Sequence, residues 1–164
     1  MKFEIAQDVA VAPARAIAAY GTPDFYAGRP GRDDIVVLEV VDHEDRGDRI
    51  IIEVRFAFTG SVSSAVRAVI DPAKMSWITR TEVRLTEATT SWVVHPDHYR
   101  DRLTAAGGYR FQQGPEGPDS TVVNVEGDLK VHVPIVGRSV ERVIVSDLRA
   151  YIADEVTSIP DLAG

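Results

Sequence analysis

The chain has 164 residues, of which 45% are hydrophobic and 26% are charged, and its formal net charge is −7. This length and composition are typical of a globular protein, so we expect residues 1–164 to form a single domain. The negative charge argues against a sequence-independent nucleic-acid binder, which needs a basic surface, and no apolar run reaches the roughly 18 residues of a membrane span. Because the chain has no cysteine, disulfide and thiolate chemistry are excluded and a soluble cytoplasmic protein is favoured.

The first predicted elements are a strand and two short helices. Lys2 to Val9 alternates apolar and polar side chains, as a strand does. Pro13 opens a short helix that we expect to end at Gly21. Thr22 is expected to cap a second short helix, which the glycines and proline of residues 28–31 break.

An antiparallel pair of strands is predicted next, over Asp34 to Val41 and Arg49 to Phe58, with the polar turn Asp42 to Asp48 between them. Ser61 to Ile70 has helical spacing and is stopped by proline at position 72, so we expect a short helical insertion. The predicted inner face of the second strand holds Ile50, Ile52, Val54, Phe56 and Phe58.

Four further strands are predicted, over Met75 to Leu85, Thr89 to His95, Thr104 to Phe111 and Thr121 to Val133. Gln112 to Asp119 is rich in glycine and proline and predicts a hairpin loop. In the strand from Thr89 to His95, which contains Trp92, either face could be the inner one. The predicted inner face of the strand from Met75 to Leu85 holds Trp77, Thr79, Thr81, Val83 and Leu85. The predicted inner face of the strand from Thr104 to Phe111 holds Tyr109 and Phe111.

The last predicted element is a long helix from Pro134 to about Ser158, stopped by the Ile159–Pro160 pair. Val143 and Tyr151 widen its apolar row into a stripe, while Glu141 is predicted to lie off that stripe. Since a strict i+4 row drifts around a 3.6-residue helix, a curved sheet suits it better than a flat one. The row itself consists of Val136, Val140, Ile144, Leu148, Ile152 and Val156.

These elements predict an α+β fold in which a curved antiparallel sheet of about seven strands wraps the long C-terminal helix, with two short helices after the first strand. Their order resembles the START-like, or helix-grip, superfamily of polyketide cyclase/dehydrase and lipid-transport proteins. The resemblance is strongest to an uncharacterised, mainly actinobacterial family within it. The segments that carry it are Met1 to Ile5, Asp24 to Tyr26, Asp71 to Lys74 before Trp77, Pro96 to Tyr99, Gly108 to Phe111, Gly127 to Leu129, and Val133 to Gly137 with Glu141.

The superfamily resemblance implies a cavity between sheet and helix that takes lipids, polyketides or other apolar molecules. The aromatic residues on the predicted inner faces fit a filled core and a pocket equally well. Thr79 and Thr81 are hydroxyls on an otherwise apolar face, and we expect them to orient a ligand if the cavity exists. The predicted ligand-binding residues are Phe25, Tyr26, Phe56, Phe58, Trp77, Thr79, Thr81, Trp92, Tyr109, Phe111, Val140, Ile144, Leu148, Tyr151 and Ile152.

Other chemistries receive less support from the sequence. His95, Asp97 and His98 are metal-binding residue types, but their spacing matches no established site, so we expect no metal and no cofactor. The predicted inner strand faces carry no His, Glu, Asp or Arg, which argues against a cyclase or aromatase-like enzyme. A co-chaperone-like interaction module stays open, because Val62, Val66 and Val69 would present an apolar surface or cover the open end of the sheet.

We therefore expect a protein that binds or transports a hydrophobic small molecule without catalysis. The sequence leaves the ligand and the oligomeric state open.

Overall fold

The computed structural model describes residues 1–27, 34–68 and 70–162. The predicted break at residues 28–31 and the apolar Val69 lie outside the described residues. The helices and strands are β1 (Lys2–Val9), α1 (Pro13–Tyr20), α2 (Pro23–Ala27), β2 (Ile35–Asp45), β3 (Arg49–Phe58), α3 (Ser64–Arg67), the 3₁₀ helix η1 (Pro72–Lys74), β4 (Ser76–Arg84), β5 (Thr89–Pro96), β6 (Leu103–Gly114), β7 (Gly117–Val131), α4 (Gly137–Thr157) and α5 (Ile159–Leu162).

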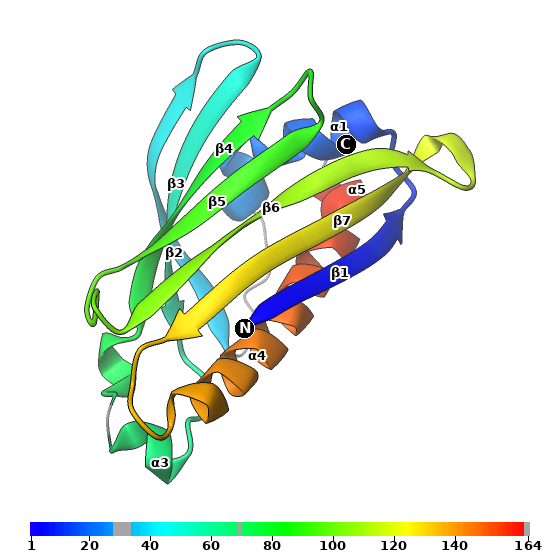
Figure 1. Cartoon of the computed structure of the whole chain (residues 1–164). Coiled ribbons are helices and arrows are strands. Elements are labelled where there is room, and N and C mark those ends of the chain that lie inside the picture. The colour runs from blue at the N-terminus through cyan, green and yellow to red at the C-terminus, as the bar shows by residue number, and fades with distance from the viewer. Residues whose placement is uncertain (28–33, 69, 163–164) are drawn as a thin grey trace.

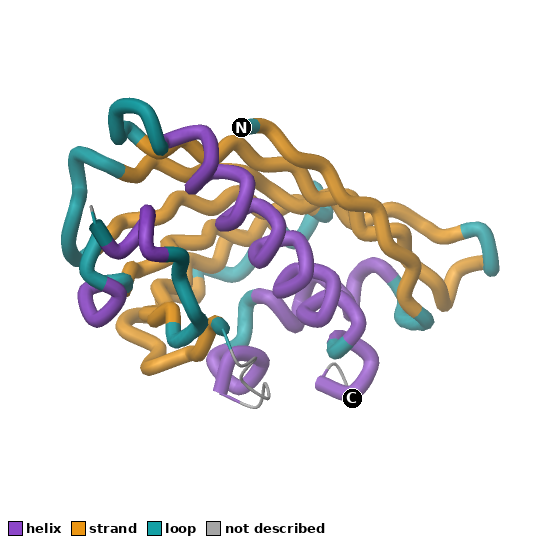
Figure 2. The backbone as a smooth tube through the Cα atoms, turned by 90° about the horizontal axis from the view of Figure 1, so that it is seen from below, coloured by secondary structure: helices purple, strands orange, loops and turns teal. Residues whose placement is uncertain are grey.

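Among the described residues, seven strands form one antiparallel sheet in the order β1-β7-β6-β5-β4-β3-β2. The sheet curves, and α4 lies across its concave side, where it packs on β7 and β1 (Figure 1; Figure 2). The short helices α1 and α2 cover one end of this concave side, and α3 lies at the opposite end (Figure 1). The predicted α+β helix-grip architecture is confirmed.

The concave face has a deep position where the strands leave room for one large side chain. Trp92 on β5 pairs with Gly107 on β6, and Gly107 pairs with Gly127 on β7. A Cβ atom on Gly107 would collide with the Trp92 ring and with the backbone carbonyl oxygen of Glu126. The absence of a side chain at Gly107 therefore lets the indole of Trp92 lie against the backbone, and it settles which face of β5 points inward.

Two predicted turns are wrong because the strands around them are longer. β6 and β7 run through most of the predicted loop, and Gly114 pairs with Gly117 around a two-residue turn. Gly117 has φ +110°, a conformation that glycine adopts without strain. β2 continues to Asp45 past the predicted end at Val41, and its His43 Nε2 hydrogen bonds with the carbonyl oxygen of Gly21 at 2.9 Å.

The long helix begins three residues later than predicted, at Gly137 instead of Pro134. Ile135 has φ +69°, which no helix accommodates, so Pro134 belongs to a turn before the helix. The helix ends at Thr157, which confirms the stop near Ser158. A further short helix, α5, follows, and it tolerates Pro160 because its first turn requires no amide donor at that residue.

The buried face of α4 follows most of the predicted apolar row, with Val140, Ile152 and Val156 buried and Ile144 and Leu148 half-buried. Val143, predicted on the stripe, is 49% exposed.

The prediction that Glu141 lies off the buried face is wrong. The side chain is 9% exposed, because its carboxylate accepts a hydrogen bond from the Val131 amide at 3.0 Å and lies 3.7 Å from the N-terminal ammonium. Among the described helices, none has the length and apolar character needed to cross a membrane.

Candidate functional site

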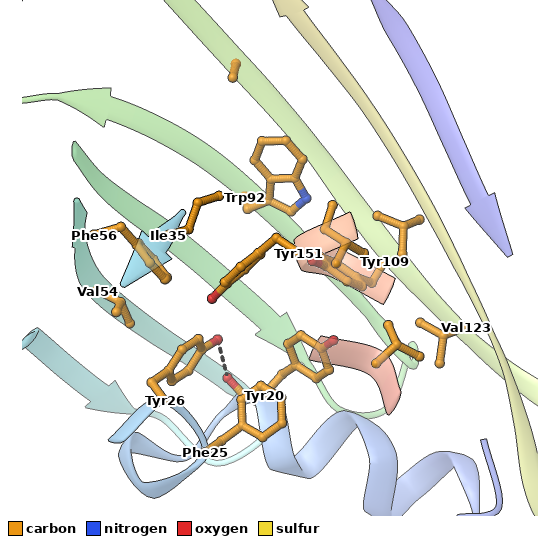
Figure 3. Packing of buried hydrophobic residues seen from close by; sticks show 14 of the residues in the cluster. Tyr20, Phe25, Tyr26, Ile35, Val54, Phe56, Trp92, Tyr109, Val123 and Tyr151 are labelled. Carbon is orange, nitrogen blue, oxygen red and sulfur yellow. Dashed lines mark hydrogen bonds between the residues drawn. The ribbon is translucent and has the colours of Figure 1, made fainter. Parts of the chain in front are cut away.

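A pocket of about 220 Å³ lies between the concave face of the sheet and α4. Its walls come mainly from the inner positions of β3 to β7 and from α4. Figure 3 shows how the aromatic side chains of Phe56, Trp92, Tyr109 and Tyr151 converge there from different elements. Most of the lining is aliphatic or aromatic, which is the usual character of small-molecule pockets.

The structure brings most of the predicted ligand-binding residues together around this pocket. Thr79 and Thr81 both contribute to the lining, and Thr81 is buried. The predicted residues that line it are Tyr26, Phe56, Phe58, Trp77, Thr79, Thr81, Trp92, Tyr109, Val140, Ile144, Leu148, Tyr151 and Ile152.

Phe25 and Phe111 lie instead in an aromatic cluster around Tyr20. Their ring centroids are 4.8 Å and 5.4 Å from that of Tyr20, and both residues are buried. Tyr20 itself lines the pocket, although its position on α1 gave no sign of this in the sequence. These two phenylalanines therefore contact the back of a pocket-lining ring and do not line the pocket themselves.

The end of the pocket near α1 and α2 is closed and contains the buried polar groups. The Tyr109 hydroxyl donates a hydrogen bond to Glu155 Oε1 at 2.8 Å, and Glu155 is only 5% exposed. At the same end, the Tyr26 hydroxyl donates to the Tyr20 carbonyl oxygen at 3.2 Å (Figure 3). The inner strand faces carry few charges, as predicted, but α4 supplies the carboxyl group that the sequence analysis did not find.

Trp92 adds a hydrogen-bond donor to this closed end. The residue is 6% exposed, and its indole Nε1 has no hydrogen-bond partner among the described residues. In Figure 3 the indole nitrogen lies on the side of the ring that faces Tyr151 and Tyr109. An unpaired buried N–H group carries a free-energy cost, which a ligand with an acceptor atom would remove.

The other end of the pocket, next to α3, opens towards solvent. Ser63, Lys74, His98 and Val143 line it and are exposed. Val62 and Val66 also face the pocket, so these two valines cover the open end and do not form an outward surface. The pocket is therefore apolar along its length, open and polar at the α3 end, and closed and polar at the Glu155 end.

Of the residues His95, Asp97 and His98 at the end of β5, Asp97 is held by hydrogen bonds within the sheet. Asp97 accepts hydrogen bonds from the Ser76 hydroxyl at 2.7 Å and from the Arg55 guanidinium at 3.3 Å. Within residues 1–27, 34–68 and 70–162, no three acidic or histidine side chains gather as a metal-binding group.

The sequence profile of the family described as "Protein of unknown function (DUF2505)" matches residues 4–160. No curated protein matches the sequence significantly.

Solved structures similar to this chain include three on which most of both chains superpose. The Zhui aromatase/cyclase from Streptomyces sp. R1128 is 10% identical with a TM-score of 0.65, covering 99% of this chain and 93% of that chain. A norcoclaurine synthase point mutant from Thalictrum flavum, in complex with a transition state analogue, is 17% identical with a TM-score of 0.65, covering 100% and 96%. A START superfamily protein from Mycobacterium smegmatis is 16% identical with a TM-score of 0.53, covering 94% of each. At such low identities these likenesses show the fold alone.

Proposed function

The chain belongs to the DUF2505 family and has a START-like fold, and from this premise we propose that it binds an apolar small molecule, lipid-like or polyketide-like, without converting it. The observation that carries the proposal is the pocket between the sheet and α4, whose lining is almost entirely apolar. Each 100 Å² of apolar ligand surface buried there would contribute about 2.5 kcal/mol to binding. The net charge of −7 supports a small-molecule partner over a nucleic acid, and the absence of cysteine supports a cytoplasmic location.

Native mass spectrometry of gently purified protein tests the proposal, followed by solvent extraction of whatever leaves the protein on denaturation. We expect a reproducible apolar compound at a fixed stoichiometry. A ligand-free mass that remains unshifted after incubation with a panel of lipids and polyketides would contradict it.

An enzyme of the cyclase type is a second candidate, and one observation favours it. The pocket contains a carboxyl group, Glu155, held by the Tyr109 hydroxyl, and such a pair is suited to proton transfer to or from a bound substrate. The extracted compounds separate the two functions. For a binding protein, the compound released by Glu155→Gln should remain unchanged when it is incubated with the wild-type protein, whereas for an enzyme the wild type should convert it into the compound that the wild type itself releases.

The interaction-module alternative loses its main support in the structure. Val62 and Val66, two of the three valines predicted to form an apolar partner surface, line the pocket.

A further inference from the structure

We propose that the closed end of the pocket recognises a hydroxyl group, so that the ligand is an uncharged, otherwise apolar alcohol or phenol inserted with its hydroxyl first. This inference rests on the proposed binding function and specifies the ligand class for the same pocket. It follows from the hydrogen-bonding capacities of two buried side chains, Trp92 and Glu155.

Trp92 supplies a donor that requires an acceptor. An indole N–H can only donate, and in this structure it is buried, lines the pocket and has no partner among the described residues. Neither a hydrocarbon nor an ammonium group satisfies it. The ligand must therefore carry an oxygen or another acceptor at this depth.

Glu155 supplies an acceptor in the same pocket. Its Oε1 accepts from the Tyr109 hydroxyl at 2.8 Å, and a carboxylate has further lone pairs for a second donor. The two groups share one region of the pocket: Trp92 pairs with Gly107, and Tyr109 lies two residues farther along β6 on the same face. Diagonal positions of this kind have backbones about 7–8 Å apart on neighbouring strands, so the Trp92 and Tyr109 side chains enter the same region of the pocket.

One hydroxyl group can form hydrogen bonds with both side chains. Its oxygen accepts from the Trp92 N–H and its hydrogen is donated to the Glu155 carboxylate. An ether or ketone satisfies only Trp92. A carboxylate ligand, such as a fatty-acid anion, would place its negative charge beside the buried Glu155 and be disfavoured by repulsion and desolvation.

The orientation follows from the two ends of the pocket. The polar atom of the ligand lies against Trp92 and Glu155, its apolar body contacts Ile144, Leu148 and Trp77, and its far end reaches the open end next to α3.

The test uses four compounds of the same ring skeleton and isothermal titration calorimetry on the full chain: naphthalene, 2-methoxynaphthalene, 2-naphthol and 2-naphthoate. We expect 2-methoxynaphthalene to bind about 3- to 10-fold more tightly than naphthalene, because its oxygen accepts from Trp92. We expect 2-naphthol to bind more tightly than 2-methoxynaphthalene by a factor of about the same size, because its hydroxyl donates to Glu155. We expect 2-naphthoate to bind more weakly than 2-naphthol.

Two variants test which side chain causes each difference in affinity. Trp92→Phe keeps an aromatic ring but removes the donor, and it should abolish the preference for 2-methoxynaphthalene over naphthalene. Glu155→Gln removes the negative charge, and it should raise the affinity for 2-naphthoate relative to 2-naphthol. Trp77→Phe is the matched control: it removes an indole that contacts the apolar body of the ligand, so it should lower all four affinities by a similar factor and leave both preferences, which are ratios of affinities, unchanged.

The outcomes separate this inference from the function on which it rests. Equal affinity of the wild-type protein for all three neutral compounds would overturn hydroxyl recognition. A water molecule bound to Trp92 and Glu155 would give this result. The proposal of apolar ligand binding would still stand. Failure of every compound to bind would count against both proposals.

Discussion

Gly107 illustrates how a missing side chain shapes this protein. Its position under the Trp92 ring and beside the Glu126 carbonyl oxygen leaves no space for a methyl group. We predict that Gly107→Ala lowers the free energy of unfolding by about 1–3 kcal/mol, because the backbone must shift to accept the Cβ atom. Urea unfolding followed by circular dichroism measures the change.

A double variant shows how much of that loss involves Trp92. In a Trp92→Phe background the ring is smaller, so Gly107→Ala should cost less than in the wild type, although the clash with the carbonyl oxygen persists. Equal costs in the two backgrounds would mean that the indole does not require the glycine.

Glu82 provides a pH-dependent contribution to stability. Burial of its carboxyl group acts to raise its pKa, but hydrogen bonds and charge interactions with Arg49 and Arg84, at 2.6 Å and 2.7 Å, together lower it below the ordinary 4.5. A lowered folded-state pKa gives stability that is fully present above the unfolded pKa and is lost as the pH falls through the folded-state value.

We therefore predict that Glu82→Gln destabilises the protein near neutral pH, and that the difference from the wild type shrinks as the pH falls below about 4.5. Unfolding free energies measured between pH 7 and pH 3 test this. Parallel pH profiles of the two proteins would contradict it.

The side chains of the pocket were predictable to different degrees. Alternation along a strand has a fixed period of two, and it placed Thr79, Thr81 and Tyr109 on the inner face correctly. Glu155 was missed, although it follows Tyr151 by four residues and Ile152 by three, spacings that place it on the same helical face. The sequence analysis assigned no role to this residue, and the hydrogen bond from the Tyr109 hydroxyl explains its burial.

At the scale of elements, α4 forms one wall of the pocket. Leu148 lies on its pocket side and is half-buried, while the next residue, Arg149, is exposed. We predict that Leu148→Trp fills the pocket and lowers the affinity for apolar ligands at least tenfold with cooperative unfolding retained. The measurement is calorimetric titration with 2-naphthol.

Arg149→Trp is the control for this substitution, since it places the same ring one residue away on the exposed face. It should leave binding unchanged. Retained binding in Leu148→Trp would contradict the position of the ligand between α4 and the sheet.

The ends of elements were harder to predict than their existence. Periodicity identified every strand of the sheet, because most of them bury one face, although β2 buries only Ile35. The hairpin between β6 and β7 was predicted as a loop, since glycine and proline are common both in loops and at the tip of a tight turn. The start of α4 was missed because Pro134 suits a first helical position, whereas the left-handed Ile135 prevents the helix from starting there.

At the scale of the whole molecule, the two ends of the sheet differ in how firmly they are closed. α1 and α2 carry the buried Tyr20, Phe25 and Tyr26, whereas α3 is a four-residue helix from Ser64 to Arg67 whose two end residues are exposed. Segments with few buried contacts open more readily than the core. The α3 end is thus the route by which we expect a ligand to enter.

We predict that hydrogen exchange is faster in Ser64–Arg67 than in the centre of β7, and that saturating 2-naphthol slows exchange in the α3 segment. Mass spectrometry of peptides from deuterated protein measures both. Slowing confined to the peptides of α1 and α2 would place the entrance at the other end.

The whole architecture was predictable because each element carries its own periodicity and the order of elements leaves few ways to pack them. The polarity of the pocket ends was not predictable. It depends on which residues of α1, α3 and α4 meet the sheet, and no local pattern records such contacts between distant segments.

The placement of the tryptophans gives the protein an internal optical signal. The chain has two, Trp77 and Trp92, and both line the pocket. Trp92 lies near the closed end and Trp77 near the open end, stacked on Phe56 with ring centroids 5.9 Å apart. Ultraviolet emission from the unlabelled protein therefore originates entirely from the pocket walls, so occupancy, depth of insertion and exchange of a ligand can be followed in real time without attaching a dye.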